Sequence, residues 1–279
     1  TGSLISSFHK MEHLEFGEVF QHIVPAIKLK KISLDFAKAF IHNYLNQLIY
    51  NKYLSRNVNF RKDDRTGIHN AKDPKRYIKR LKEKEGDNII KKINLEKPII
   101  PFVTHDIICN YSDFHRLNLD IKIIEIFRNP IDLIYSWHKK KLVQRYGKDK
   151  RIFTLLLRHK NQVVSQHMYH LSNDWNKINS LEKCIVYINI LINRSVQQIK
   201  KNKKKNLLYI TSYERLLSNT NIELQKISKF IKTKFSSKTK KFIKNEKCPR
   251  IIDQKEKNKK LAFIKKNISK KYIKILNKM

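Results

Sequence analysis

Apolar and polar positions change their spacing along the chain, and the changes predict helices alternating with short strands. Apolar residues recur at helical spacing from Leu4 to about Tyr53 and again from Leu181 to Lys200. A shorter apolar run at 122–127 contains β-branched residues and suits an inner strand of a parallel sheet. The pattern therefore predicts an α/β chain.

Three basic or charged stretches complete the pattern. A highly charged stretch at about 57–96 predicts an insertion of exposed loop and helix. A basic helical run is expected after Ser136, reaching about Gln166. The Lys-rich tail at about 252–279 carries apolar residues at helical spacing, which predicts a helix that packs or lies on a surface. We expect one domain covering residues 1–279.

The junction after the run at 122–127 carries the most informative residues. Asn129 is a good N-cap, Pro130 suits the first helical position, and Asp132 suits the third, where a carboxylate complements the helix dipole. Arg128 stands at the end of the strand, and Ser136 follows two helical turns later, about 10 Å along the axis. We expect Arg128 and Ser136 to bind one phosphate.

This segment resembles the 3'-phosphate signature of the sulfotransferases, in which an apolar strand, Arg-Asn-Pro, an Asp and a later Ser follow one another. The resemblance implies that Arg128 and Ser136 bind 3'-phosphoadenosine 5'-phosphosulfate (PAPS), the sulfuryl donor. It also implies a P-loop-like three-layer α/β fold, with a central parallel sheet flanked by helices. The alternative is an ordinary strand-turn-helix with a solvated Arg and a surface Ser.

The start of the chain resembles the end of the family's 5'-phosphosulfate loop. Thr1, Gly2 and Ser3 combine a glycine that permits close backbone approach with two hydroxyl donors. The run from His13 to Glu18 follows at the spacing at which bacterial and carbohydrate-type members carry His-Pro-Glu and Gly-Glu. The strand and basic residue that precede this loop in the family are absent. The resemblance therefore implies an N-terminally truncated sequence, and the alternative is that these residues are not the loop.

Two residues are candidates for the base that deprotonates the acceptor. His105 ends a short apolar run and precedes Arg128 by 23 residues, which resembles the catalytic His of the cytosolic members, although Val103 replaces their Lys. Glu18 matches the Glu that serves tyrosylprotein and several carbohydrate sulfotransferases. A His at a strand end is also a common structural residue. Both assignments stay open.

The last match to the family lies later in the chain. The run at 206–216 resembles the family's strand that ends in Tyr-Glu-Asp-Leu, which implies that Tyr213 lines the adenine site. Arg215 replaces the usual Asp. A buried Tyr that only packs against the strand is the alternative reading.

Composition narrows the function classes. The net charge of +37 would attract an anionic cofactor, substrate or nucleic acid. The three cysteines are far apart, so neither a disulfide framework nor a zinc cluster is predicted, and we expect no metal and a cytoplasmic location. The five glycines build neither Gly-x-x-x-x-Gly-Lys-Ser/Thr nor Gly-x-Gly-x-x-Gly, which disfavours ordinary ATPases and dinucleotide dehydrogenases.

The sequence thus predicts a PAPS-dependent enzyme that sulfates a hydroxyl, and a carbohydrate or lipid-linked sugar is the expected acceptor. One rival is a basic nucleic-acid-binding protein. The other is an inactive protein of the sulfotransferase fold, which Val103, Arg215 and the missing basic residue favour.

Overall fold

The computed structural model describes residues 2–145, 149–152, 154–159, 162–169, 175, 177–202 and 205–279. The backbone packs into two compact units. The first unit comprises Thr1–Val19, Ile32–Thr104 and Arg215–Arg250, and the second comprises Phe20–Lys31, His105–Glu214 and Ile251–Met279. The chain passes between the units five times, and two of these passages lie within helices, α2 (Glu18–Lys28) and α9 (Tyr213–Ser218).

The first unit contains a short parallel sheet in which β1 (Glu15–Phe16) pairs with β2 (Phe102–Val103). Its other elements are α1 (Gly2–Ser6), α3 (Leu34–Tyr53), η1 (Ile68–Asn70), α4 (Pro74–Arg80), α5 (Asp87–Glu96), α10 (Thr220–Phe230) and α11 (Thr239–Asn245). The Ser33 hydroxyl caps α3 by accepting from the Phe36 amide, and Asp73 with Pro74 starts α4 in the same manner.

A buried ionic cluster lies inside the first unit. The Glu12 side chain is 1% exposed and accepts hydrogen bonds from the Tyr77 hydroxyl at 2.6 Å and from Arg80 at 3.0 and 3.2 Å. Arg76 lies 3.2 Å from the same carboxylate. Burial by itself would raise the pKa of Glu12, but the charges of both arginines and the hydrogen bonds lower it overall.

The second unit is built around a longer parallel pair, β3 (Ile123–Phe127) and β6 (Leu208–Ser212), with Phe127 opposite Ser212. Its helices are α6 (Tyr111–Arg116), α7 (Pro130–Lys139), α8 (Ser180–Lys201), α12 (Gln254–Lys266) and α13 (Lys270–Leu276), with the shorter turns η2 (Ile107–Asn110), η3 (Leu142–Gln144) and η5 (Lys205–Leu207). An antiparallel hairpin joins β4 (Leu156–His159) to β5 (Gln162–Ser165).

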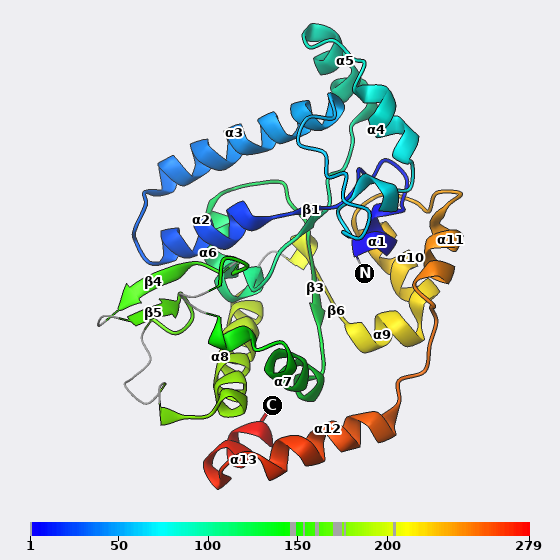
Figure 1. The fold of residues 1–279 in the computed structure, drawn as a ribbon. Helices are drawn as coiled ribbons and strands as arrows, with labels where there is room; N and C mark the ends of the chain where they lie inside the picture. Colours follow the sequence, from blue (N-terminus) through cyan, green and yellow to red (C-terminus); the bar gives the residue numbers. More distant parts are fainter. Residues whose placement is uncertain are drawn as a thin grey trace. The chain divides into compact units, whose positions relative to one another are not determined.

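Helices α7, α8, α12 and α13 pack together in the second unit (Figure 1) and contribute buried residues to an apolar core. A capping box at Asn179 and Glu182 fixes the start of α8. Ile134 of α7, Ile185 of α8 and Ile264 of α12 meet in this core and are fully buried. Burial of this kind stabilises by about 25 cal/mol per Å² of apolar surface.

The expected α/β class is confirmed, with small parallel sheets. The predicted strands and the helix from Leu181 correspond to β3, β6 and α8, and the tail forms two helices that pack against α7 and α8. The uninterrupted helical pattern expected up to about Tyr53 was wrong in detail, because β1 interrupts it.

The basic helical run expected to extend to about Gln166 was also wrong. Helix α7 ends at Lys139, and Lys141 adopts a left-handed conformation with φ 53°. Residues 156–159 and 162–165 then form the hairpin, in which β-branched Val163 and Val164 suit a strand better than a helix. Among the described residues, no helix combines the length and the apolar character needed to cross a membrane.

Candidate functional site

The junction between β3 and α7 has the local structure that its sequence predicts. The Asn129 side chain accepts a hydrogen bond from the Ile131 amide at 3.0 Å, and Pro130 is the first helical residue. The Leu133 amide bonds the Asn129 carbonyl at 3.1 Å. Arg128 is therefore held between the last residue of a strand and a capped helix, which restricts its backbone.

Two residues that follow β6 contact this junction. The Tyr213 ring centre lies 5.2 Å from the Arg128 guanidinium carbon, within the range of a cation–π interaction. The Glu214 carboxylate accepts a hydrogen bond from the Asn129 amide at 2.9 Å. The structure therefore brings together Arg128 and Tyr213, which the sequence placed in one site from separate motifs.

Arg128 has unused hydrogen-bonding capacity. Its Nε is buried and has no hydrogen-bond partner, and within the described part of the chain Arg128 forms no ion pair. Ser136 lies two turns into α7 and is partly buried, and its hydroxyl donates no hydrogen bond to a described residue. Since leaving a buried donor unpaired costs about 1–3 kcal/mol, the guanidinium is suited to an anionic ligand.

Asp132, expected to complement the first turn of α7, also binds across to α12. Its Oδ1 lies 2.8 Å from Lys260 Nζ. Hydrogen bonds from Lys260 to Asp132 and Glu256 raise the pKa of Lys260. This ion pair joins the C-terminal helices to the helix that carries Ser136.

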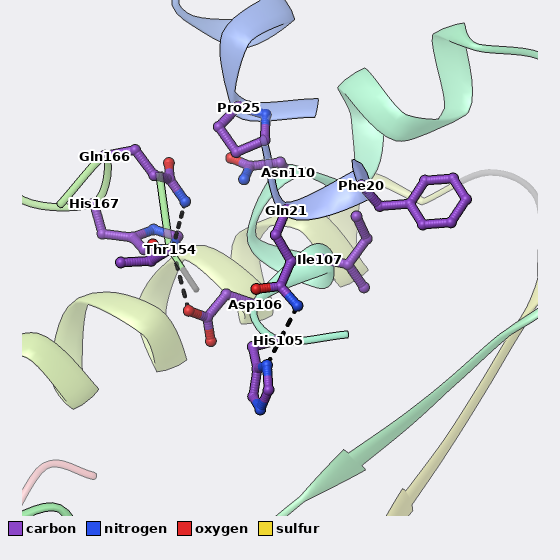
Figure 2. A pocket seen from close by; sticks show the side chains of 10 residues that line it. All are labelled: Phe20, Gln21, Pro25, His105, Asp106, Ile107, Asn110, Thr154, Gln166 and His167. Carbon is purple, nitrogen blue, oxygen red and sulfur yellow. Dashed lines mark hydrogen bonds and ion pairs between the residues drawn. The ribbon is translucent and has the colours of Figure 1, made fainter. Parts of the chain in front are cut away.

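His105 lines a small pocket in the second unit. Figure 2 shows side chains from four segments around it. The lining residues are Phe20, Gln21, Pro25, His105, Asp106, Ile107, Asn110, Thr154, Gln166 and His167. The cavity is about 10 Å³, which is near the lower limit for one water molecule. It is polar on most sides but too small, as it stands, for a whole acceptor.

Gln21 of α2 contacts the His105 ring. Its amide nitrogen lies 3.3 Å from His105 Nδ1 (Figure 2). An amide nitrogen can only donate, so in this orientation Nδ1 accepts and the ring proton lies on Nε2. His105 can remove a proton through Nε2 only if the Gln21 carboxamide is turned round, so that its oxygen accepts from Nδ1–H.

His167, on the other side of the pocket, is held by charged neighbours. Its side chain is fully buried, its Nε2 lies 3.4 Å from Asp106 Oδ2, and Arg194 lies 3.2 Å from Nδ1. A guanidinium only donates, so Nδ1 accepts from Arg194, while Nε2 faces both Asp106 and the Gln166 carboxamide nitrogen, which lies 2.5 Å away. This arrangement suits a structural histidine that fixes Asp106 next to His105.

Sequence reasoning missed Glu125. This partly buried residue of β3 has a pKa raised to about 7, first by burial and then by the negative charge of Asp106. Its signal was a single carboxylate within an otherwise apolar strand. Gln21, Asp106 and Glu214 were missed as well, and only Glu214, beside Tyr213, had a sequence signal.

The remaining candidates belong to the first unit. Gly2 and Ser3 lie in α1, whereas Thr1 lies outside the described residues. A Cβ on Gly2 would come within 3.3 Å of side-chain atoms of Leu14 and Val103, so close packing favours glycine there. Glu18 is the first residue of α2, where its carboxylate complements the positive end of the helix.

Metal ligands do not gather in the described residues, where no group of three or more His, Cys, Asp or Glu side chains could hold a metal ion. Comparison of the chain with family models, with curated proteins and with solved structures returned no match. Arguments about function therefore rest on the two clusters around Arg128 and His105.

Proposed function

We propose that this protein is a sulfotransferase that moves a sulfuryl group from PAPS to a hydroxyl, with a carbohydrate or lipid-linked sugar as the acceptor. The observation that carries the proposal is Arg128. A buried guanidinium nitrogen without a partner stands at the carboxyl end of a parallel strand, immediately before a helix. Ligands of open parallel sheets bind at that end of the strands.

The residues at the junction suit a phosphate held by side chains. Arg128 offers planar donors that match an oxyanion, and the Ser136 hydroxyl adds one more. Two of the nearby amides are already engaged, since the Asn129 amide bonds Glu214 and the Ile131 amide bonds the Asn129 side chain. Tyr213, beside Arg128, would line the adenine. The assignment of Thr1, Gly2 and Ser3 to the 5'-phosphosulfate site rests on the sequence resemblance.

PAPS would supply an activated sulfuryl group, and the protein would position the acceptor and remove its proton. A base at the acceptor hydroxyl is worth about 10²–10⁴-fold in rate. His105 and Glu18 are both retained as candidates. His105 has the polar pocket beside it, and serves as a base at Nε2 only when Gln21 presents its oxygen to Nδ1.

The proposal includes the finer architecture, a P-loop-like three-layer fold with a central parallel sheet. Its support is that both β1–β2 and β3–β6 are parallel pairs, which require crossover connections through helices. Because a parallel sheet is stable when helices cover both faces, such pairs are typical of layered α/β folds.

Calorimetric titration with adenosine 3',5'-bisphosphate tests the proposal on the full-length protein. We expect Arg128→Ala to weaken binding about 100-fold or more and Ser136→Ala about tenfold, because charge-assisted hydrogen bonds are worth about 1.5–3 kcal/mol. Arg116→Ala is the matched control, since this exposed arginine belongs to the same unit and pairs with Asp113 at 3.3 Å. Absence of binding by the unmutated protein would remove the proposal.

Turnover assays separate the two bases. A large rate loss with unchanged bisphosphate affinity in either His105→Ala or Glu18→Gln identifies the base, and normal rates in both variants refute both assignments. Cofactor binding without turnover on any hydroxyl acceptor would instead indicate an inactive binding protein.

The net charge of +37 specifically favours one other function, nucleic-acid binding. That function predicts affinity for DNA or RNA that falls steeply with salt and survives Arg128→Ala. The bisphosphate titration with the same variant distinguishes the two functions.

A further inference from the structure

We infer that Glu214 is a positioning residue for Arg128, an inference that rests on the proposed function. It contacts neither ligand nor reacting atoms. It holds the backbone of the β3–α7 junction, and that backbone carries the guanidinium.

The parallel register places Glu214 at this point. Phe127 lies opposite Ser212 at the ends of β3 and β6. The next residues along each chain meet in the same order, since Tyr213 contacts Arg128 at 5.2 Å and the Glu214 carboxylate accepts from the Asn129 amide at 2.9 Å. Two consecutive residues after one strand thus fix two consecutive residues after the other.

The bond to the Asn129 amide has two consequences. It fixes Asn129, the residue between Arg128 and α7. The Asn129 side chain in turn caps the helix by accepting from the Ile131 amide. It also directs the Glu214 carboxylate to the backbone rather than to the guanidinium, and among the described residues Arg128 forms no ion pair. A carboxylate paired with Arg128 would compete with an incoming phosphate for the same donors.

Glu214 therefore determines how α7 takes part in binding. The negative carboxylate occupies the positive end of the helix dipole, and Pro130 supplies no amide hydrogen. Recognition of the anion then depends on the side chains of Arg128 and Ser136 and on the precision with which the junction holds them. Loss of Glu214 frees the Asn129 amide and loosens Arg128 without removing any ligand contact.

The test compares Glu214→Ala with Glu214→Gln, which retains an oxygen acceptor. We expect Glu214→Ala to weaken adenosine 3',5'-bisphosphate binding about tenfold and to speed hydrogen exchange at the Asn129 amide by a similar factor. Glu214→Gln should remain within about threefold of the unmutated protein in both measurements. The control is Asp120→Ala, which removes an exposed carboxylate of the same unit.

Exchange at the Asn129 amide is measured without ligand, so it separates this inference from the proposed function. If the unmutated protein binds no bisphosphate, the proposed function fails, and with it the role in anion binding. If the protein binds but Glu214→Ala leaves affinity or Asn129 exchange unchanged, the inference alone is overturned. Equal losses of bisphosphate affinity and of Asn129 amide protection in both Glu214 variants also overturn it, since the oxygen acceptor of Glu214→Gln should preserve both. Should Glu214→Ala fail to fold, Glu214→Gln must still preserve binding and exchange.

Discussion

Replacement of Glu12 by alanine is expected to destabilise the first unit strongly. The Glu12 carboxylate is 1% exposed and neutralises Arg80, whose side chain is 8% exposed, and Arg76, which is 28% exposed. Its removal takes away the acceptor of the Tyr77 hydroxyl and the nearest carboxylate of the buried Arg80 guanidinium, which keeps a hydrogen bond to the Lys52 carbonyl at 3.3 Å. Breaking a buried ion pair by removing one partner costs about 3–5 kcal/mol.

The matched control is Glu85→Ala. Glu85 also contacts an arginine, Arg56, but its side chain is 67% exposed and that of Arg56 is 50% exposed. Exposed pairs contribute about 0–1 kcal/mol because water and salt screen the charges. Both variants delete a carboxylate that binds an arginine in the same unit. The expected difference of several kcal/mol between their losses of unfolding free energy therefore reports the effect of burying the ion pair.

Equilibrium urea unfolding followed by circular dichroism measures both variants. The folded-state pKa of Glu12 is lowered below its ordinary value of 4.5, so its contribution to stability is complete above about pH 4.5 and is lost as pH falls through the lower folded pKa. The difference in unfolding free energy between the unmutated protein and Glu12→Ala should therefore have its full value at pH 7 and become smaller in acid. The reasoning would be refuted if Glu12→Ala and Glu85→Ala lowered the free energy of unfolding equally, or if the effect of Glu12→Ala did not depend on pH.

Three further predictions follow from the second unit and the thiols. The pKa of Glu125 is raised from 4.5 to about 7, so the stability of the protein should fall as pH rises between these values. At pH 8, Glu125→Gln should need more urea to unfold than the unmutated protein, whereas at pH 4 it should not. Gln21→Ala should change the ¹⁵N shifts of the His105 ring, which report its tautomer; an unchanged spectrum contradicts the assignment. Cys109 and Cys184 are buried with pKa values raised to about 12 by burial, so a thiol reagent should label only Cys248 rapidly in the folded protein.

The elements predicted from sequence were those whose signals are local. The N-cap at Asn129, the strand at 122–127 and the helix from Leu181 depend on neighbouring residues and on apolar spacing, and the structure confirms them. The hairpin at 156–165 was missed, because the basic residues before it continued a helical pattern and nothing local showed where α7 ends. The role of Arg128 stays a prediction.

The sequence by itself determined the composition of the junction: an arginine at the end of an apolar strand, a capped helix and a serine two turns along it. Only the tertiary structure decided which distant residues meet these. The register of β3 with β6 brought Tyr213 and Glu214 to the junction, and the packing of α2 brought Gln21 to His105. The physical reason is that helix caps and apolar spacing act over a few residues, whereas contacts between residues 84 or 85 positions apart exist only once burial has set the register of the strands and the packing of the helices.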